Sequence, residues 1–327
     1  MVGEPTVDMR TPRTLIRAVA GVSGGLSRAS NKRELFALAP YVFGSALASL
    51  IPRKLYIYPS TVAGAIGYIT NSDRRNSARA AQALAGGPSV SRFEIERRTC
   101  AAFVSYLQYW MESLAITTFD REELKVGLSV EGEVPLLELT KSGAGAIVAT
   151  AHLGNWDWGG SWVGSFVHPF SAVVEPLKPD VLADWFFDHR RELGIEPILL
   201  NGSVAKQVIA GVRAGRIVAL VSDRDLSGTG VEVQFFGRTV KMPSGAAVLA
   251  LRTKTPIFPG IVYMSRRGEH LIKFLDPIYP GDAIGGDLSE KVAWLTQAVS
   301  SALESLIRVA PTQWHVMQPL PVLPVNR

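Results

Sequence analysis

A histidine and an aspartate follow a short apolar run in the middle of the chain. The run covers residues 146–149 (AIVA), lies between glycines, and is followed by His152 and Asp157. An apolar run of this kind predicts a buried strand. The Asp157 carboxylate could fold back onto the imidazole across a tight turn and fix its tautomer, so that His152 takes a proton from an acceptor hydroxyl. The alternative is an ordinary polar residue at a strand end.

A second apolar run, residues 216–222 (RIVALVS), ends in Asp223, Arg224 and Asp225. The carboxyl ends of neighbouring parallel strands meet at one edge of a sheet, where ligands bind in α/β folds. We therefore expect Asp223 to reach His152 and orient it, with Asp157 holding the turn or sharing that role. The alternative is a solvated loop in which Asp225 pairs with Arg224.

The turn after His152 predicts the rest of a transfer site. Asn155 suits the N-cap of a helix over residues 156–162, and the backbone amides of residues 153–156 could stabilise a tetrahedral oxyanion. No serine stands in a G-x-S-x-G motif that follows a predicted strand. We therefore expect no covalent intermediate on a serine.

Strand and helix patterns alternate from residue 145 to residue 222, which favours an α/β fold with a mostly parallel central sheet and helices on both faces. A single domain is expected over residues 35–319, with a loosely ordered basic arm at 1–34 and a tail at 320–327. The predicted strands cover residues 124–131, 146–149, 172–174, 195–200, 216–222, 257–264 and 271–275. The predicted helices cover residues 72–86, 91–114, 135–142, 156–162, 179–193, 203–214, 244–254 and 289–309.

Residues 35–68 form an apolar helical region with few charges to define an outer face. Such helices belong either in a core or in a membrane interface. Prolines at 40, 52 and 59 interrupt the region, so no membrane-spanning helix is expected. No secretory signal is expected at the start of the chain either.

The composition narrows the function classes. The chain has 327 residues, of which 47% are hydrophobic and 19% charged, and its net charge is +5. The positive charge favours an anionic membrane surface or a phosphorylated ligand, and no nucleic-acid motif accompanies it. Cys100 is the sole cysteine, so neither a disulfide framework nor a cysteine-rich metal site is expected.

The segment HLGNWD (152–157) resembles the HX4D signature of the glycerolipid and lipid A acyltransferase superfamily. Residues 173–198, 222–253 and 311–319 resemble the actinobacterial phosphatidylinositol mannoside acyltransferases, and the likeness extends over about residues 35–319. In those enzymes the position matching Asp223 is a glutamate, so the carboxylate here has a shorter reach. The resemblance also proposes substrate-binding roles for Arg190, Thr229 and Glu175. Two further substrate-binding candidates are Arg224 and Arg252. Arg252 stands where those enzymes carry a glutamate, and a cation there would suit a phosphate or be an ordinary surface residue.

The resemblance implies transfer of a long-chain acyl group from acyl-CoA, or an acyl-carrier thioester, to a hydroxyl of a membrane glycolipid. The transfer would be direct, without a covalent acyl-enzyme, and the acyl chain would lie between the helices predicted over residues 156–162 and 91–114. A phosphatidylinositol mannoside is the first candidate acceptor. It also implies a peripheral enzyme at the cytoplasmic face of the cell membrane, with acyl-CoA as co-substrate and no metal or other cofactor. The alternatives are another lipid or secondary-metabolite acceptor, or a catalytically silent homologue that binds lipid.

Overall fold

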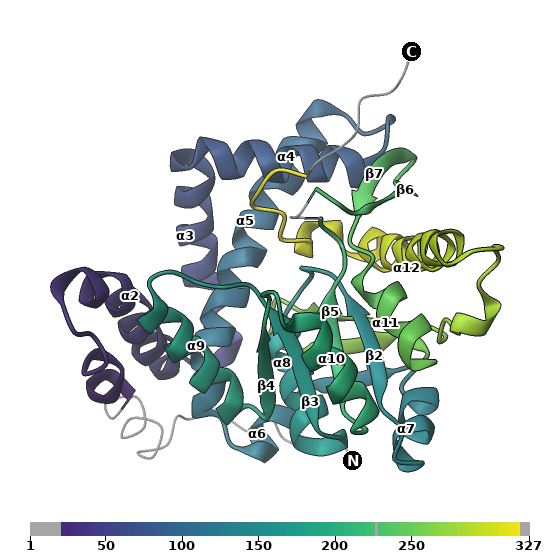
Figure 1. The fold of residues 1–327 in the computed structure, drawn as a ribbon. Helices are drawn as coiled ribbons and strands as arrows, with labels where there is room; N and C mark the ends of the chain where they lie inside the picture. Colours follow the sequence, from purple (N-terminus) through teal and green to yellow (C-terminus); the bar gives the residue numbers. More distant parts are fainter. Residues whose placement is uncertain (1–20, 226–227, 321–327) are drawn as a thin grey trace, which may run out of the picture.

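The structure, a computed structural model, describes residues 21–225 and 228–320. Its centre is a seven-stranded sheet in the order β1-β9-β8-β2-β5-β3-β4, and Figure 1 shows β4, β3, β5 and β2 side by side. Every neighbouring pair is parallel except β8 and β9. The strands are β1 (Leu128–Glu131), β2 (Ala146–Thr150), β3 (Phe170–Val174), β4 (Ile195–Leu199), β5 (Ile217–Val221), β8 (Ile257–Met264) and β9 (His270–Phe274).

Helices cover both faces of this sheet, as the sequence predicts. Ile147 and Ala149 of β2 point into a core with α10 (Val204–Arg213), α11 (Gly245–Thr253) and α12 (Leu288–Val309). Ala146 and Val148 point into the opposite core, which includes Trp158 of α8 (Trp156–Trp162). Successive side chains of a strand point to opposite faces of the sheet. Because helices cover both faces, the side chains of residues 146–149 in β2 must all be apolar.

The amino-terminal part of the described chain is helical, as expected. It comprises α2 (Lys32–Leu50), α3 (Ile57–Thr70), α4 (Ser72–Gly86) and α5 (Arg92–Ala115), which lie beside the sheet in purple and blue (Figure 1). The remaining helices are α6 (Arg121–Lys125), α7 (Val134–Lys141) and α9 (Asp180–Glu192). In the described chain no single helix is long and apolar enough to cross a membrane, and α2 with residues 53–70 meets that criterion only as a pair bent by 109°.

The structure corrects two predicted boundaries. The strand predicted over residues 124–131 begins at Leu128, because a capping box between Asp120 and Glu123 holds α6 in helical form. Residues 21–26 are helical and α2 begins at Lys32, so regular structure begins before the predicted boundary at residue 35. The rest of the predicted arm, residues 1–20, and most of the predicted tail lie outside the described residues.

The sequence reading missed a β-hairpin, β6 (Val231–Phe235) and β7 (Arg238–Met242). Its signal was present, because VEVQF alternates apolar and polar residues. Phe236 and Gly237 form the turn with φ values of 50° and 72°, as a two-residue hairpin loop requires. Phe235 and Phe236 are buried against Trp314, so this aromatic pair belongs to the core.

Candidate active site

His152 and Asp223 lie together at the carboxyl ends of β2 and β5, which are parallel neighbours. His152 Nδ1 lies 2.8 Å from Asp223 Oδ1, and the His152 backbone N–H donates to Asp223 Oδ2 at 3.2 Å. Asp223 is fully buried, whereas 30% of the His152 side chain is exposed. A carboxylate on Nδ1 holds the ring proton there and leaves Nε2 free to accept one.

Asp223 has a further partner that sequence reasoning missed. The buried Trp314 side chain donates its Nε1–H to Asp223 Oδ2 at 2.7 Å. Burial raises the pKa of Asp223, but the charge of His152 and the hydrogen bonds from His152 and Trp314 outweigh it, so the pKa lies below its ordinary value. The carboxylate is therefore ionised at neutral pH and available to orient His152.

The segment that carries Trp314 also holds the His152 backbone. The His315 N–H donates to the His152 carbonyl at 2.7 Å, and His315 Nε2 lies 2.9 Å from Ser105 Oγ of α5. Burial, reinforced by the charge of His152, lowers the pKa of His315 to about 3. His315 is thus a neutral structural residue at physiological pH. The resemblance over residues 311–319 was the only signal in the sequence for this role.

Asp157 does not fold back onto His152, which corrects the simplest reading of the H-x-x-x-x-D spacing. Its Oδ2 accepts from Tyr109 OH at 3.2 Å, and its Oδ1 lies 3.3 Å from Arg190 Nε. The reason is local. Asp157 lies in the first turn of α8, capped by Asn155, and this turn directs its side chain toward α5 and α9. Asp157 therefore holds Arg190 rather than the imidazole.

Arg190 lies near the end of α9 and borders the same site. Its guanidinium is 4.7 Å from the centre of the Trp156 ring, and only 11% of its side chain is exposed. Nε2 of the preceding residue, His189, lies 2.6 Å from the Ser113 carbonyl oxygen of α5. A carbonyl only accepts, so Nε2 carries the proton. The Arg190 cation is thus fixed by a carboxylate, an aromatic ring and the packing of its helix.

The turn between His152 and α8 packs tightly against β8. Gly154 has φ +63°, and a Cβ there would lie 1.6 Å from the Val262 carbonyl oxygen. The Leu153, Gly154 and Asn155 amides already donate to the backbone carbonyls of Ala151, Gln313 and Val262. Of the four amides expected to stabilise an oxyanion, these three are therefore committed to the fold, and that expectation is wrong for them.

Arg224 and Glu175 lie at the same edge of the sheet, after β5 and β3. Arg224 Nη2 donates to Glu175 Oε1 at 3.2 Å and Nη1 donates to Gln318 at 2.8 Å. Within the described residues the buried Arg224 Nε has no hydrogen-bond partner. Asp225, predicted as an alternative partner of Arg224, instead accepts from the Gly230 amide at 2.7 Å. Arg224 thus forms an ion pair with Glu175 at the border of the site.

Two further candidates lie away from this constellation. Thr229 is exposed in the loop before β6 and is not among the described residues that line the cavity beside His152. Arg252 lies on α11 and borders a separate surface depression with Lys206 and Arg213 of α10. Because α11 runs away from the carboxyl edge, Arg252 at its last turn cannot belong to the His152 site.

An apolar cavity of about 460 Å³ extends from His152 across the sheet face beneath α8. Its interior is lined by small and branched side chains and by glycine, including Val148, Ala172, Ala219, Val262, Gly159 and Gly260. Its polar border includes His152, Glu175, Arg190, Arg224 and Asp225. The volume lies within the range of about 300–1,000 Å³ typical of small-molecule sites. Residues of α5 do not line it, contrary to the expected position of the acyl groove.

A metal site requires several ligating side chains to converge on one point. Among the described residues no three His, Cys, Asp or Glu side chains converge as metal ligands would. What converges instead is a histidine held by a buried carboxylate, two arginines and an apolar cavity. This set suits proton transfer to and from a substrate that carries a long apolar group and an anionic group.

The family of the chain agrees with this site. Residues 33–320 match the family model for bacterial lipid A biosynthesis acyltransferases, so the chain belongs to that family and is an acyltransferase. Among similar known proteins, the phosphatidylinositol mannoside acyltransferase of Mycobacterium tuberculosis H37Rv is 36% identical over 226 residues, 67% of this chain and 69% of the relative. The corresponding enzyme of Mycolicibacterium smegmatis is 33% identical over 223 residues, 67% of this chain and 70% of that relative.

Proposed function

We propose that this protein transfers a long-chain acyl group from acyl-CoA, or an acyl-carrier thioester, to a hydroxyl of a membrane glycolipid, with a phosphatidylinositol mannoside as the acceptor. The observation that carries the proposal is the His152–Asp223 pair at the border of the apolar cavity. The 33–36% identity to phosphatidylinositol mannoside acyltransferases supports the acceptor class.

In the proposed reaction, His152 Nε2 takes the proton of the acceptor hydroxyl as its oxygen attacks the thioester carbonyl. The tetrahedral intermediate then collapses, the C–S bond breaks, and the sulfur leaves with the proton that His152 received. Asp223 keeps Nδ1 protonated throughout and stabilises the transient imidazolium. The products are an ester and a free thiol, and no covalent acyl-enzyme forms.

The polar border suits the charged parts of the two substrates. Arg190 and Arg224 are cations held at the cavity entrance, and the Arg224 Nε–H has no protein acceptor in the described chain. Guanidinium groups bind phosphate in preference to neutral groups. We assign Arg190 and Arg224 to the phosphates of the thioester donor or the acceptor headgroup, and Glu175 to acceptor hydroxyls. Thr229 and Arg252 have no part in this assignment.

The cavity beneath α8 holds the acyl chain in this proposal. Ala219 lies opposite both Val148 and Ala172 in neighbouring strands, so the three form a row across the middle of the cavity face. This row is two residues, or about 7 Å, deeper than the strand ends at the sheet edge. A larger side chain at position 219 would therefore obstruct the deeper part of the cavity and spare its entrance.

Ala219→Leu is expected to shift the donor preference toward shorter chains. The ratio of kcat/KM for palmitoyl-CoA to that for decanoyl-CoA should fall about 5- to 150-fold, because the added side chain costs about 1–3 kcal/mol against a long chain only. Ala205→Leu, on the exposed face of α10, is the matched control and should leave the ratio unchanged. An unchanged ratio in Ala219→Leu would place the acyl chain elsewhere.

Association with the membrane is assigned to α2 and α3. These helices expose a set of large apolar side chains: Phe36, Phe43, Leu47, Leu50, Tyr58, Val62, Ile66 and Ile69. Exposed apolar surface of this extent marks an interaction site. Insertion into the lipid interface would make the protein peripheral at the cytoplasmic face, where thioester donors are found, and would bring the acceptor to the enzyme.

The test is an assay with palmitoyl-CoA and vesicles that contain a phosphatidylinositol mannoside, another glycolipid or a lysophospholipid. We expect thiol release that depends on the mannoside, together with an added palmitoyl group in its mass spectrum. Phe43→Ser/Leu47→Ser should reduce sedimentation with the vesicles and leave turnover of a detergent-dispersed acceptor intact. Thiol release without an acylated lipid, or an acyl group trapped on the protein, would contradict the proposal.

A further inference from the structure

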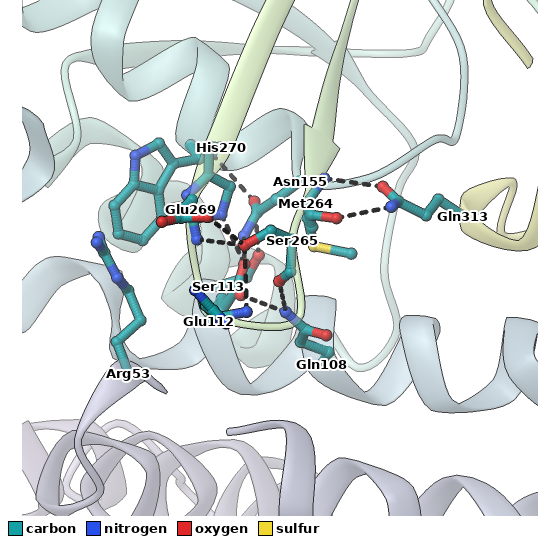
Figure 2. A network of polar contacts seen from close by, with 12 residues as sticks. Arg53, Gln108, Glu112, Ser113, Asn155, Met264, Ser265, Glu269, His270 and Gln313 are labelled. Atoms are coloured by element: carbon teal, nitrogen blue, oxygen red, sulfur yellow. Dashed lines mark hydrogen bonds and ion pairs between the residues drawn. The ribbon is translucent and has the colours of Figure 1, made fainter. Parts of the chain in front are cut away.

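A buried carboxylate, Glu112, lies on the face of α5 that packs against the turn between His152 and α8 (residues 152–155), here called the motif turn. Three side-chain donors surround it, and Figure 2 shows them converging from α5, from β9 and from the turn before α8. Gln108 Nε2 donates to Oε1 at 3.0 Å, while His270 Nε2 and Asn155 Nδ2 lie 2.8 and 2.9 Å from Oε2. Glu112 and His270 are both fully buried.

The acyl-transfer reaction described above uses neither of these residues. Neither borders the cavity formed by the described residues, so neither contacts substrate there. A buried carboxylate paired with a histidine is by itself weak evidence for stability, because desolvation offsets most of the attraction. The contacts that the pair makes therefore indicate its role better than its charge does.

Those contacts lead to the start of α8. Asn155 donates to Glu112 with its amide nitrogen, and with its amide oxygen it accepts from the Trp158 backbone N–H at 3.1 Å. The second interaction is the N-cap of α8. The orientation of the side-chain amide is thus set by Glu112, and this orientation decides which atom faces the first turn of the helix.

His270 makes a second contact with the same helix. Its ring stacks on Trp158 with the ring centres 4.2 Å apart and an angle of 11°. Trp158 Nε1 also donates to the Leu124 carbonyl at 3.2 Å. The Glu112–His270 pair thus holds both Asn155 and Trp158. Asp157 lies between these two residues in the chain, so its position depends on theirs. Asp157 in turn holds Arg190.

We propose that Glu112, fixed by His270, is a positioning residue for acyl transfer, which acts through Asn155 on the start of α8 and thereby on Asp157 and Arg190. This inference rests on the proposed function only where activity is the readout. Displacement of a substrate-positioning group by about 1 Å costs on the order of 10²-fold in rate.

The test exchanges the donor and acceptor roles of the two side chains. Asn155→Asp keeps an N-cap oxygen but places a carboxylate oxygen where the amide donated to Glu112. We expect kcat to fall about tenfold to a hundredfold, with the KM for palmitoyl-CoA changed less than about threefold. The pH profile should not shift, because the His152–Asp223 pair is untouched.

Adding Glu112→Gln to Asn155→Asp should restore kcat to within about threefold of the wild type. The glutamine keeps its oxygen toward Gln108 and presents one N–H to the carboxylate introduced at position 155. Its second N–H faces His270 Nε2, which accepts it in the Nδ1–H tautomer, so the hydrogen bonds re-form with reversed polarity. Glu94→Gln, near the start of the same helix and partly exposed, is the matched control and should leave kcat unchanged. Full activity of Asn155→Asp alone would reduce Asn155 to a helix cap and overturn the proposal.

Amide hydrogen exchange of residues 154–163 gives a readout that does not depend on activity. Asn155→Asp should raise exchange in this segment while the core strands keep their protection, and the double variant should reverse the change. Failure of the double variant to restore either kcat or protection would also overturn the proposal. Absence of wild-type turnover with every donor and acceptor would contradict the proposed function, and the exchange measurement would still decide the positioning role.

Discussion

Asp223→Asn is expected to lower kcat about 10³- to 10⁴-fold while leaving the fold intact. The reason lies in the two donors on Asp223 Oδ2, the His152 backbone N–H and Trp314 Nε1–H. Both require an acceptor, so they hold the asparagine oxygen at that position and turn its NH₂ group toward His152 Nδ1. The imidazole then keeps its proton on Nε2, where it cannot accept another.

This outcome has two measurements. Turnover of palmitoyl-CoA reports the loss of rate, and ¹⁵N chemical shifts of the His152 ring report the tautomer directly. Asp188→Asn, on the surface of α9 in an ion pair with Arg28, controls for loss of a carboxylate elsewhere and should retain full activity. Retention of more than about a tenth of kcat by Asp223→Asn would remove Asp223 from the proposed mechanism.

His152→Ala is expected to lower kcat by about 10²- to 10⁴-fold, the usual contribution of a general base. The His152 backbone contacts with Asp223 and His315 do not need the imidazole, so the turn should keep its conformation. Binding to vesicles should also survive, because the apolar surface of α2 and α3 is separate. Turnover, vesicle sedimentation and thermal unfolding, measured on the same preparation, separate these effects.

The same variant decides between an enzyme and a silent lipid-binding homologue. A homologue without turnover would show no acceptor-dependent thiol release in either protein, with vesicle binding intact in both. His168→Gln, just before β3 at the opposite edge of the sheet, is the control and should keep its turnover. Combining His152→Ala with Asp223→Asn should cost little more than the larger single effect, because the two groups act as one unit.

The sequence alone determined the features that depend on neighbouring residues in the chain, namely the buried strands and the helix cap of the site. The apolar runs of β2 and β5 could only be strands covered on both faces, and parallel pairing then brings the residues that follow them to one edge. This is why Asp223 could be expected beside His152 although 71 positions separate them. Asn155 could likewise be recognised as a helix cap from its type and place.

Sequence patterns were less informative about hydrogen-bond partners that lie far away in the chain and are brought close only by tertiary packing. The H-x-x-x-x-D spacing suggested that Asp157 would return to His152, but the first turn of α8 directs it to Tyr109 and Arg190, which belong to other helices. The three backbone amides expected to serve an oxyanion donate instead to carbonyls of three different segments. No periodicity in a single segment reports such contacts.

The tertiary structure alone decided how the site is held. Trp314 reaches Asp223 from 91 positions away, and Glu112 reaches Asn155 and His270 from 43 and 158 positions away. In the sequence, Trp314 and Glu112 look like an ordinary core aromatic and a solvated helix residue. Their hydrogen bonds exist only because the chain closes α5, β9 and its carboxyl-terminal segment around the motif turn, and a buried polar group must find its partner wherever that closure places one.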